Sequence, residues 1–494
     1  MRSHLTRTLL GAAWSLIVWA TIGHPLHAMT LEESDGIYEA ATKQLMGGDA
    51  AGAIPSLREV AAFWKSHFGP GSDEASLALG QLGVALMNTG NHQEAIESLT
   101  ECVRIRTKLK GELAPEVQGP RHNLSRCLIA VHREADAIPV LEQVVASRSA
   151  QGGPNDPRLP PVLDDLGSCL RAMKQHERAI PVFQRALTIR SAAGNVSDPE
   201  SGASHYGIGI SAQELGKFEL ALEHQMQARD LAITAKNPEL EALGHFNVGR
   251  ALAGLGRHAE AVESFEKSVR MMAQIHGESS EMTREARDEL ARALVQLGVE
   301  EFEETAYSKS VAHLNRANEI RMKDNPGELA ARSAILWKLA SAERRAGQLA
   351  QARKHLEESV ALGTRSSGAD SLALAWPLEL QSLVLAEMKQ IKEAVPLFKR
   401  ALAIRQKAGG EGLPWNIAVR ATLLDINGQT DKASAAFEKA SSMGREKKDA
   451  LLGSILIEYA AFLLRHGQAE ASKKLQVEVK GLRAARKQPA APVR

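Results

Sequence analysis

The chain has 494 residues, of which 44% are hydrophobic and only 4% aromatic. Alanine and leucine dominate, and alternating runs of valine and isoleucine are absent, which favours helices over sheets. The formal net charge of +1 gives no bulk attraction for a nucleic acid or an anionic membrane.

Residues 1–28 have the features of a secretory signal peptide. Arg2 and Arg7 supply positive charge, and the apolar stretch from Leu9 to Gly23 is followed by Ala28, a small residue suited to cleavage. The stretch is shorter than the roughly 20 residues that span a bilayer. We therefore expect an exported protein, periplasmic or secreted. The alternative is an uncleaved N-terminal membrane anchor, which is the only membrane association we consider.

A repeating unit extends over residues 34–480. A small residue, usually followed by an apolar one, marks each unit, and the first four steps between these anchors are each 42 residues. The later steps are 40, 49, 42, 42, 39 and 39 residues. Small residues also recur twelve positions before and seven positions after the anchor, where they let two helices approach closely. The anchors are Ala53, Ala95, Ala137, Ala179, Ala221, Ala261, Ser310, Ala352, Ala394, Ala433 and Ser472.

Glycines five residues before the anchor indicate a turn between two helices of each unit. They are Gly48, Gly90, Gly216, Gly256, Gly347 and Gly428. We therefore predict an all-α solenoid of about eleven helix-turn-helix repeats of about 42 residues. Residues 481–494 form a basic tail with alanine and proline, which we expect to be disordered.

One step between anchors, at 49 residues, is longer than the others. We assign Gly298 as the turn glycine of that unit, which places the seven extra residues in the acidic segment before Ser310. Seven residues make about two helical turns, so the second helix of the unit can lengthen without rotating its buried face. The segment 299–309 is then either a tolerated extension or an acidic docking element.

The segments Pro181–Arg190 and Pro396–Arg405 resemble the second helix of the kinesin-light-chain type of tetratricopeptide repeat. The 42-residue period is also that of this repeat type. The resemblance implies a tetratricopeptide α-solenoid, a right-handed superhelix whose inner groove is lined by the first helix of each repeat. In that repeat type, asparagines on the first helix bond the main chain of an extended peptide.

Candidate groove residues lie on the first helices of several repeats. An asparagine amide can donate and accept at once, which suits a peptide main chain, and arginine can pair with acidic ligand groups. Each of these residues could equally be an ordinary solvated helix residue. The candidates are Asn123, Arg126, Asp165, Asn247, Arg250, Trp337, Lys338 and Arg344.

The three cysteines, Cys102, Cys127 and Cys169, occupy repeat positions that hold small residues in other units, so we expect buried packing residues. A Cys127–Cys169 disulfide is the alternative, although equivalent positions of adjacent repeats lie about 10 Å apart, too far for a bridge. No spacing typical of a metal site, a P-loop or a catalytic nucleophile occurs. We expect no metal, no cofactor and no small-molecule substrate.

The sequence therefore predicts a non-enzymatic scaffold that binds a peptide or protein partner in the concave groove. The alternatives are a cytoplasmic or membrane-anchored regulatory adaptor, and an enzyme whose site the repeat pattern does not explain. The basic tail contains no aromatic residue to stack on bases, so we expect no nucleic-acid partner.

Overall fold

The computed structural model describes residues 29–194, 199–408, 413–449 and 451–487. Side chains are described as far as residue 482, and only the backbone is described for residues 483–487. The predicted signal peptide, residues 1–28, lies outside these ranges. Within them the regular secondary structure is entirely helical and includes no strand. The chain divides into two compact units, Met1–Leu231 and Ala232–Arg494.

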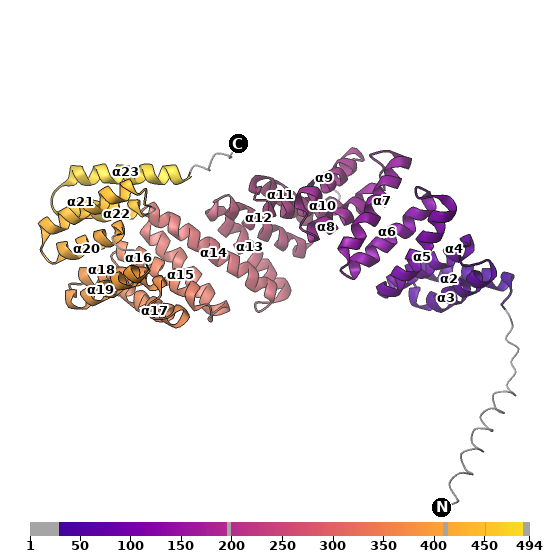
Figure 1. Ribbon diagram of the computed structural model, residues 1–494, viewed down its shortest axis with the longest axis horizontal. Coiled ribbons are helices and arrows are strands. Elements are labelled where there is room, and N and C mark those ends of the chain that lie inside the picture. The colour runs from indigo at the N-terminus through magenta and orange to yellow at the C-terminus, as the bar shows by residue number, and fades with distance from the viewer. Residues whose placement is uncertain (1–28, 195–198, 409–412, 450, 488–494) are drawn as a thin grey trace, which may run out of the picture. The chain divides into compact units, whose positions relative to one another are not determined.

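The described part of the N-terminal unit is a succession of helical hairpins (Figure 1). The last helix continues a few residues past the boundary between the units. In chain order the helices are α2 (Leu31–Met46), α3 (Ala50–His67), α4 (Asp73–Asn88), α5 (His92–Lys110), α6 (Pro115–Ala130), α7 (Glu134–Gly152), α8 (Leu159–Ala172), α9 (His176–Ala192), α10 (Pro199–Glu214) and α11 (Phe218–Thr234).

The C-terminal unit continues the same pattern, with one 3₁₀ helix, η1, between two of its hairpins. Counted over the described residues of both units, the helices make eleven pairs, as the repeat pattern predicted. The helices of this unit are α12 (Pro238–Gly254), α13 (His258–His276), α14 (Glu281–Glu303), α15 (Tyr307–Asp324), α16 (Leu329–Arg345), α17 (Leu349–Ser367), η1 (Leu372–Leu374), α18 (Ala375–Glu387), α19 (Ile391–Lys407), α20 (Pro414–Ile426), α21 (Thr430–Glu446), α22 (Leu452–Arg465) and α23 (Ala469–Lys487).

The predicted turn glycines adopt the left-handed conformation between the two helices of a hairpin. Gly90 has φ +79°, Gly256 has φ +71° and Gly347 has φ +79°, values that cost little without a Cβ atom. Where a hairpin lacks this glycine, another residue takes the same conformation, such as Lys174 or Lys389. The turn chemistry therefore fixes the hairpin, and the sequence identified it correctly.

The long repeat differs from the prediction. Gly298 is not a turn residue: it lies inside α14, and the left-handed turn residue is Thr305 with φ +66°. The seven extra residues lengthen the first helix of the hairpin, α14, to 23 residues and leave the second helix unchanged in register. Two added helical turns keep the buried face in phase, so Gly298 packs against Leu314 as a close-approach position.

The small residues of the first helices face the large apolar residues of the second. A Cβ atom on Gly167 would lie 2.7 Å from the ring of Phe183, and one on Gly249 would lie 2.8 Å from the ring of Phe265. The hairpins can close to this distance only because these positions lack a side chain. These contacts form the core that the repeat pattern predicted.

The three cysteines are buried and none forms a disulfide. Burial raises the pKa of the Cys102 and Cys127 thiols to about 11 and that of Cys169 to about 12. They therefore act as small packing residues, as predicted, because a buried neutral thiol is unreactive.

At the C-terminal end, α23 continues to Lys487, seven residues into the segment predicted to be a disordered tail. Residues 488–494 lie outside the described residues. None of the helices that the structure describes is long and apolar enough to cross a membrane.

Candidate functional site

The first helices of successive hairpins contact one another in the N-terminal unit, α4 with α6, α6 with α8, and α8 with α10. Side chains from these helices can therefore act together although they are about one repeat apart in the sequence. His122 of α6 and Asp165 of α8 show this directly, because the His122 Nε2 and Asp165 Oδ2 atoms lie 2.9 Å apart. We call the surface of α6 and α8 that carries Asn123, Arg126 and Asp165 the A-helix face.

The polar side chains of the A-helix face differ in how exposed they are and in whether they already have a hydrogen-bond partner. Arg126 is exposed, and Asn123 is partly exposed next to it. Neither residue has a hydrogen-bond or ion-pair partner among the described residues. Asp165 is partly buried and already held by His122. The face therefore offers a free guanidinium and a free amide beside a fixed carboxylate.

Asn247 and Arg250 do not extend this face into the C-terminal unit. Asn247 is only 2% exposed, and its Nδ2 donates to the Leu243 carbonyl of its own helix at 3.0 Å. It is therefore not available to bond a peptide main chain, contrary to the sequence-based expectation. The Arg250 guanidinium lies 6.0 Å from the ring centroid of Phe246 on the same helix, a cation–π contact.

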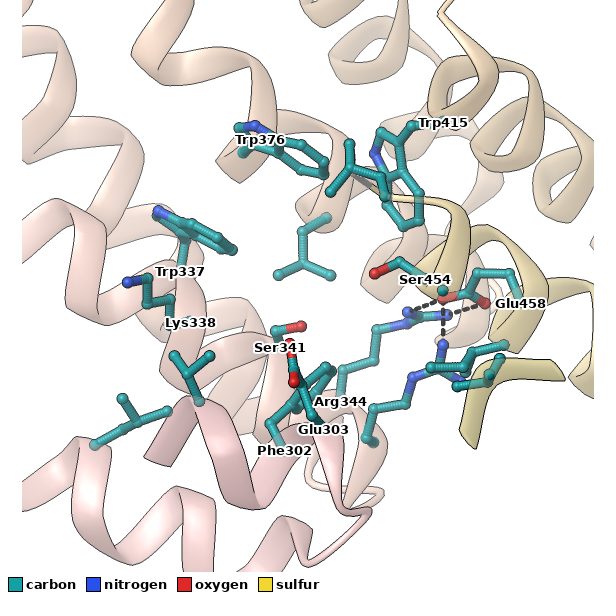
Figure 2. Close-up of a pocket in the computed structure, with 18 of the residues that line it drawn as sticks. Phe302, Glu303, Trp337, Lys338, Ser341, Arg344, Trp376, Trp415, Ser454 and Glu458 are labelled. Carbon is teal, nitrogen blue, oxygen red and sulfur yellow. Dashed lines mark hydrogen bonds and ion pairs between the residues drawn. The ribbon is translucent and has the colours of Figure 1, made fainter. Parts of the chain in front are cut away.

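The other three candidates, Trp337, Lys338 and Arg344, come together in a pocket of the C-terminal unit (Figure 2). The pocket has a volume of about 340 Å³ and is lined mainly by apolar atoms of α14, α16, α18, α20, α22 and α23. Five of these six are first helices of hairpins that follow one another along the unit, α14, α16, α18, α20 and α22. Trp337, Lys338 and Arg344, which the sequence had assigned to a groove, thus line a pocket between these helices.

Three tryptophans form one wall of the pocket. Trp337, Trp376 and Trp415 are 39 residues apart from one to the next, and each comes from a different first helix. The rings of Trp337 and Trp376 are nearly parallel, at 13°, with centroids 6.1 Å apart, and the centroids of Trp376 and Trp415 are 5.4 Å apart. Such offset contacts hold large aromatic surfaces in fixed positions.

A buried carboxylate holds Trp415 in place. Glu379 of α18 accepts a hydrogen bond from the Trp415 Nε1 at 3.0 Å and two from the Arg405 guanidinium, at 2.6 and 2.9 Å. The Arg405 guanidinium also lies 4.9 Å from the centroid of Trp376. The aromatic wall is therefore oriented by a hydrogen-bonded ion pair behind it, in addition to its own packing.

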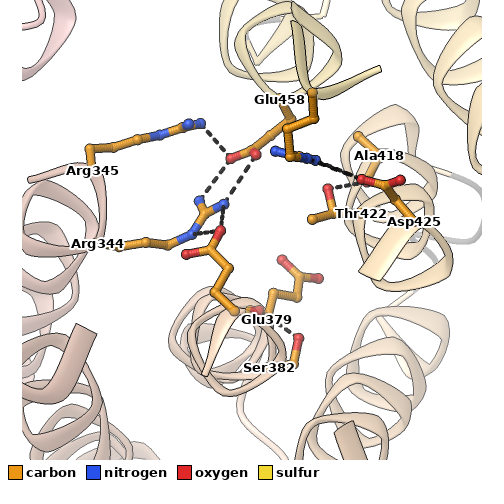
Figure 3. A network of polar contacts seen from close by, with 10 residues as sticks. Arg344, Arg345, Glu379, Ser382, Ala418, Thr422, Asp425 and Glu458 are labelled. Carbon is orange, nitrogen blue, oxygen red and sulfur yellow. Dashed lines mark hydrogen bonds and ion pairs between the residues drawn. The ribbon is translucent and has the colours of Figure 1, made fainter. Parts of the chain in front are cut away.

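The opposite side of the pocket is closed by an ion-pair network (Figure 3). Arg344 donates to Glu458 at 2.8 Å and to Glu387 at 2.7 Å, and Arg345 donates to Glu458 at 2.5 Å. Burial opposes the charge on Glu458, but the two guanidiniums outweigh it and hold the pKa of this carboxyl well below its usual range. Arg344 is therefore a structural element of the pocket wall, with its donors already used.

Several polar groups that line the pocket have no hydrogen-bond partner among the described residues. They are the Lys338 ammonium, the Glu303 carboxylate and the hydroxyls of Ser341 and Ser454. Burial lowers the pKa of Lys338, and the nearest interaction of its ammonium is with the Trp337 ring at 5.9 Å from the centroid. A mostly apolar cavity with a few unpaired polar groups is the usual form of a ligand site.

The sequence missed the residues that α14 and α23 add to the pocket. Phe302 and Val299 belong to the two extra turns of α14, and Val479 belongs to α23. The unusual 49-residue step was the only signal for the first two. In the described part of the chain, no group of three or more histidine, cysteine, aspartate or glutamate side chains is placed so that it could bind a metal ion.

Several family models match the chain. Residues 120–192, 161–234 and 331–407 match one tetratricopeptide repeat model, residues 77–108 a second and residues 206–274 a third. Residues 415–466 match a model of anaphase-promoting complex subunit 5. No curated protein matches the chain.

Three solved structures with a similar chain path are distant in sequence. The TPR-like repeats described as kinesin light chain from Podosopora anserina are 22% identical, with a TM-score of 0.36 over 43% of this chain and 99% of theirs. The apo form of RapI is 13% identical, with a TM-score of 0.42 over 58% of this chain and 98% of its own. Aspartyl phosphate phosphatase F from Bacillus subtilis is 12% identical, with a TM-score of 0.42 over 77% of this chain and 97% of its own.

Proposed function

The chain belongs to the tetratricopeptide repeat family, and on that premise we propose that it is a scaffold whose protein partner binds the A-helix face of the N-terminal unit. Tetratricopeptide repeats generally bind protein partners, because stacked hairpins present a long surface that folds independently of any ligand. We propose binding without catalysis. The charged groups around Glu458 are committed to one another as ion pairs.

The observation that carries the proposal is that the Arg126 guanidinium is exposed and has no partner among the described residues. The partly exposed amide of Asn123 lies beside it, and their helix, α6, contacts the first helices of the neighbouring hairpins. A guanidinium can bind a carboxylate of a partner through two parallel hydrogen bonds, and an amide can bond a peptide main chain. The fixed pair of His122 and Asp165 keeps the neighbouring helix in register for such a ligand.

The test is a quantitative pull-down from native extract after chemical crosslinking, with the wild-type chain, Arg126→Glu and Lys108→Glu. Lys108 is an exposed cation on α5, a second helix, so it is a matched control for the change in charge. We expect at least one partner that the wild type and Lys108→Glu capture equally and Arg126→Glu captures poorly. Equal recovery of every partner by all three chains would rule out the A-helix face.

We further propose that the protein acts outside the cytoplasm, because residues 1–28 carry the charge and apolar pattern of a signal peptide. The alternative is an adaptor that stays in the cytoplasm or at the membrane. Fractionation of a tagged chain, with mass spectrometry of its N-terminus, separates them. A mature chain that begins near Met29 in an extracytoplasmic fraction supports export, and an intact N-terminus in the cytoplasm or membrane contradicts it.

A further inference from the structure

The pocket of the C-terminal unit contains a positive charge for which the described residues provide no counter-charge. Lys338 lies beside Trp337, while Glu303 and the pair of Arg344 and Glu458 lie apart from it (Figure 2). The remaining charged residue that lines the pocket, Arg345, is paired with Glu458. Burial lowers the pKa of Lys338, and its ammonium forms no ion pair with any of the described carboxylates. A partly buried ammonium without an anion is costly for the empty protein and favours an anionic ligand.

The remaining surface near Lys338 is flat and aromatic. Trp337 and Trp376 present nearly parallel rings, and Trp415 continues the wall beyond them. Ring faces of this kind bind planar apolar groups by stacking, and they are held here before any ligand enters. The hydroxyls of Ser341 and Ser454 add two hydrogen-bonding groups that have no protein partner.

The size of the cavity decides between a polypeptide and a small molecule. Its volume of about 340 Å³ lies at the lower end of the range of roughly 300–1,000 Å³ for small-molecule sites. An α-helix, roughly 10–12 Å across with its side chains, is too wide for it. The buried ion pairs of Arg344 and Arg345 with Glu458 close the far side, so an extended segment has no path through the pocket.

We propose that this pocket is a binding site for a small organic anion with a planar apolar body, with the anion at Lys338 and the body against Trp337 and Trp376. The site is separate from the A-helix face and does not depend on the proposed function. It also differs from the sequence-based expectation that no small molecule binds, because three tryptophans spaced along the sequence gave no sign that they share one wall.

The test compares two fluorescent probes that share a planar body, anilinonaphthalene sulfonate, which is anionic, and N-phenyl-1-naphthylamine, which is neutral. Three of the six tryptophans of the full chain lie in the pocket, so energy transfer from tryptophan to the probe reports on this site. We expect the wild type to bind one molecule of the anionic probe, about tenfold more tightly than the neutral one, as a charge-assisted contact provides.

Three variants assign the preference to Lys338. Lys338→Met should bind the two probes equally, and Lys338→Arg should keep the preference for the anion. Lys399→Met, which removes an exposed lysine of α19 outside the pocket, should behave as the wild type. Lys338 lines the cavity and has no hydrogen-bond partner among the described residues, so its replacement by methionine should not lower the circular-dichroism melting temperature.

Three results would overturn the proposal. The first is absence of energy transfer to the anionic probe, and the second is equal binding of the two probes by the wild type. The third is an anion preference that survives in Lys338→Met or is lost equally in Lys399→Met. None of these outcomes affects the pull-down with Arg126→Glu, so the two proposals fail independently.

Discussion

Arg344 of α16 and Glu458 of α22 form a buried ion pair, with 2.8 Å between Nη1 and Oε1, although 114 residues separate them in the chain. Three first helices, α16, α18 and α20, precede α22 in this part of the unit, so the pair joins elements that are not neighbours in the repeat order. The pair therefore closes the C-terminal unit on itself, and the pocket exists because of this closure.

Replacement of Glu458 by glutamine should destabilise the C-terminal unit. Arg344 would keep Glu387, but Arg345 would lose its only carboxylate partner among the described residues. Breaking a buried ion pair in this way costs about 3–5 kcal/mol in the free energy of unfolding. Denaturant unfolding measures that loss, and hydrogen exchange should show faster exchange in α22 and α23.

The control for Glu458→Gln is Asp370→Asn, which breaks the ion pair of Asp370 with Lys407. Both of these side chains are more than two-thirds exposed, so the change should be within error of the wild type. Equal effects of the two substitutions would show that the buried network does not stabilise the closed arrangement.

The stability of the N-terminal unit should depend on a pair of histidines. The Nδ1 atoms of His205 and His224 lie 2.9 Å apart, so one ring donates and the other accepts, and the accepting Nδ1 must carry no proton. Burial, with a contribution from His224, lowers the pKa of His205 to about 4, and burial lowers that of His224, although Glu223 opposes the second shift. Because the unfolded rings bind protons more readily, stability is complete above pH 6.5 and is lost as the pH falls towards 4.

This dependence can be measured by denaturant unfolding between pH 7 and pH 4. The wild type should lose stability over that range, and His205→Gln should lose less of it. His132→Gln is the control, because the side chain of His132 is 91% exposed. A steeper loss in His205→Gln than in the wild type would contradict this assignment.

Two glycine substitutions test the close approach within a hairpin. An alanine at Gly167 would place its Cβ atom 2.7 Å from the ring of Phe183, so Gly167→Ala should lower stability by roughly 1–3 kcal/mol. Gly36 in α2 has no atom within 4 Å of the added Cβ, so Gly36→Ala should raise stability by roughly 0.5–1 kcal/mol. Thermal melts of both variants give the signs, and a stabilised Gly167→Ala would disprove the packing described for α8 and α9.

The repeat and its hairpins could be predicted because each hairpin depends on nearby residues. A glycine such as Gly90 in the turn, and a small residue such as Gly167 facing Phe183, report on contacts within one repeat. The long repeat was misread because Gly298 satisfies the spacing of a turn glycine while it serves as a close-approach residue in a longer helix. Seven residues shift a helix by two turns, so the hydrophobic pattern alone does not show which helix has grown.

The candidate site was predicted only in part, for a related reason. Trp337 and Lys338 do line a common pocket, but its closure depends on contacts such as Arg344 with Glu458, which no local pattern reveals. Asn247 has the residue type and spacing of a groove asparagine, yet its burial and its bond to Leu243 follow from the way α12 packs. Position in the repeat therefore predicts which helix a residue occupies better than whether its side chain is available.

The central claim, that a partner binds the A-helix face, is tested most directly by site-specific photocrosslinking. The chain would carry benzoylphenylalanine in place of Ala130, an exposed residue of α6 one helical turn from Arg126, in one sample and of Lys108 in the other. Our account predicts a partner protein crosslinked from position 130 and not from position 108. Crosslinks of equal yield from both positions, or from position 108 alone, would contradict it.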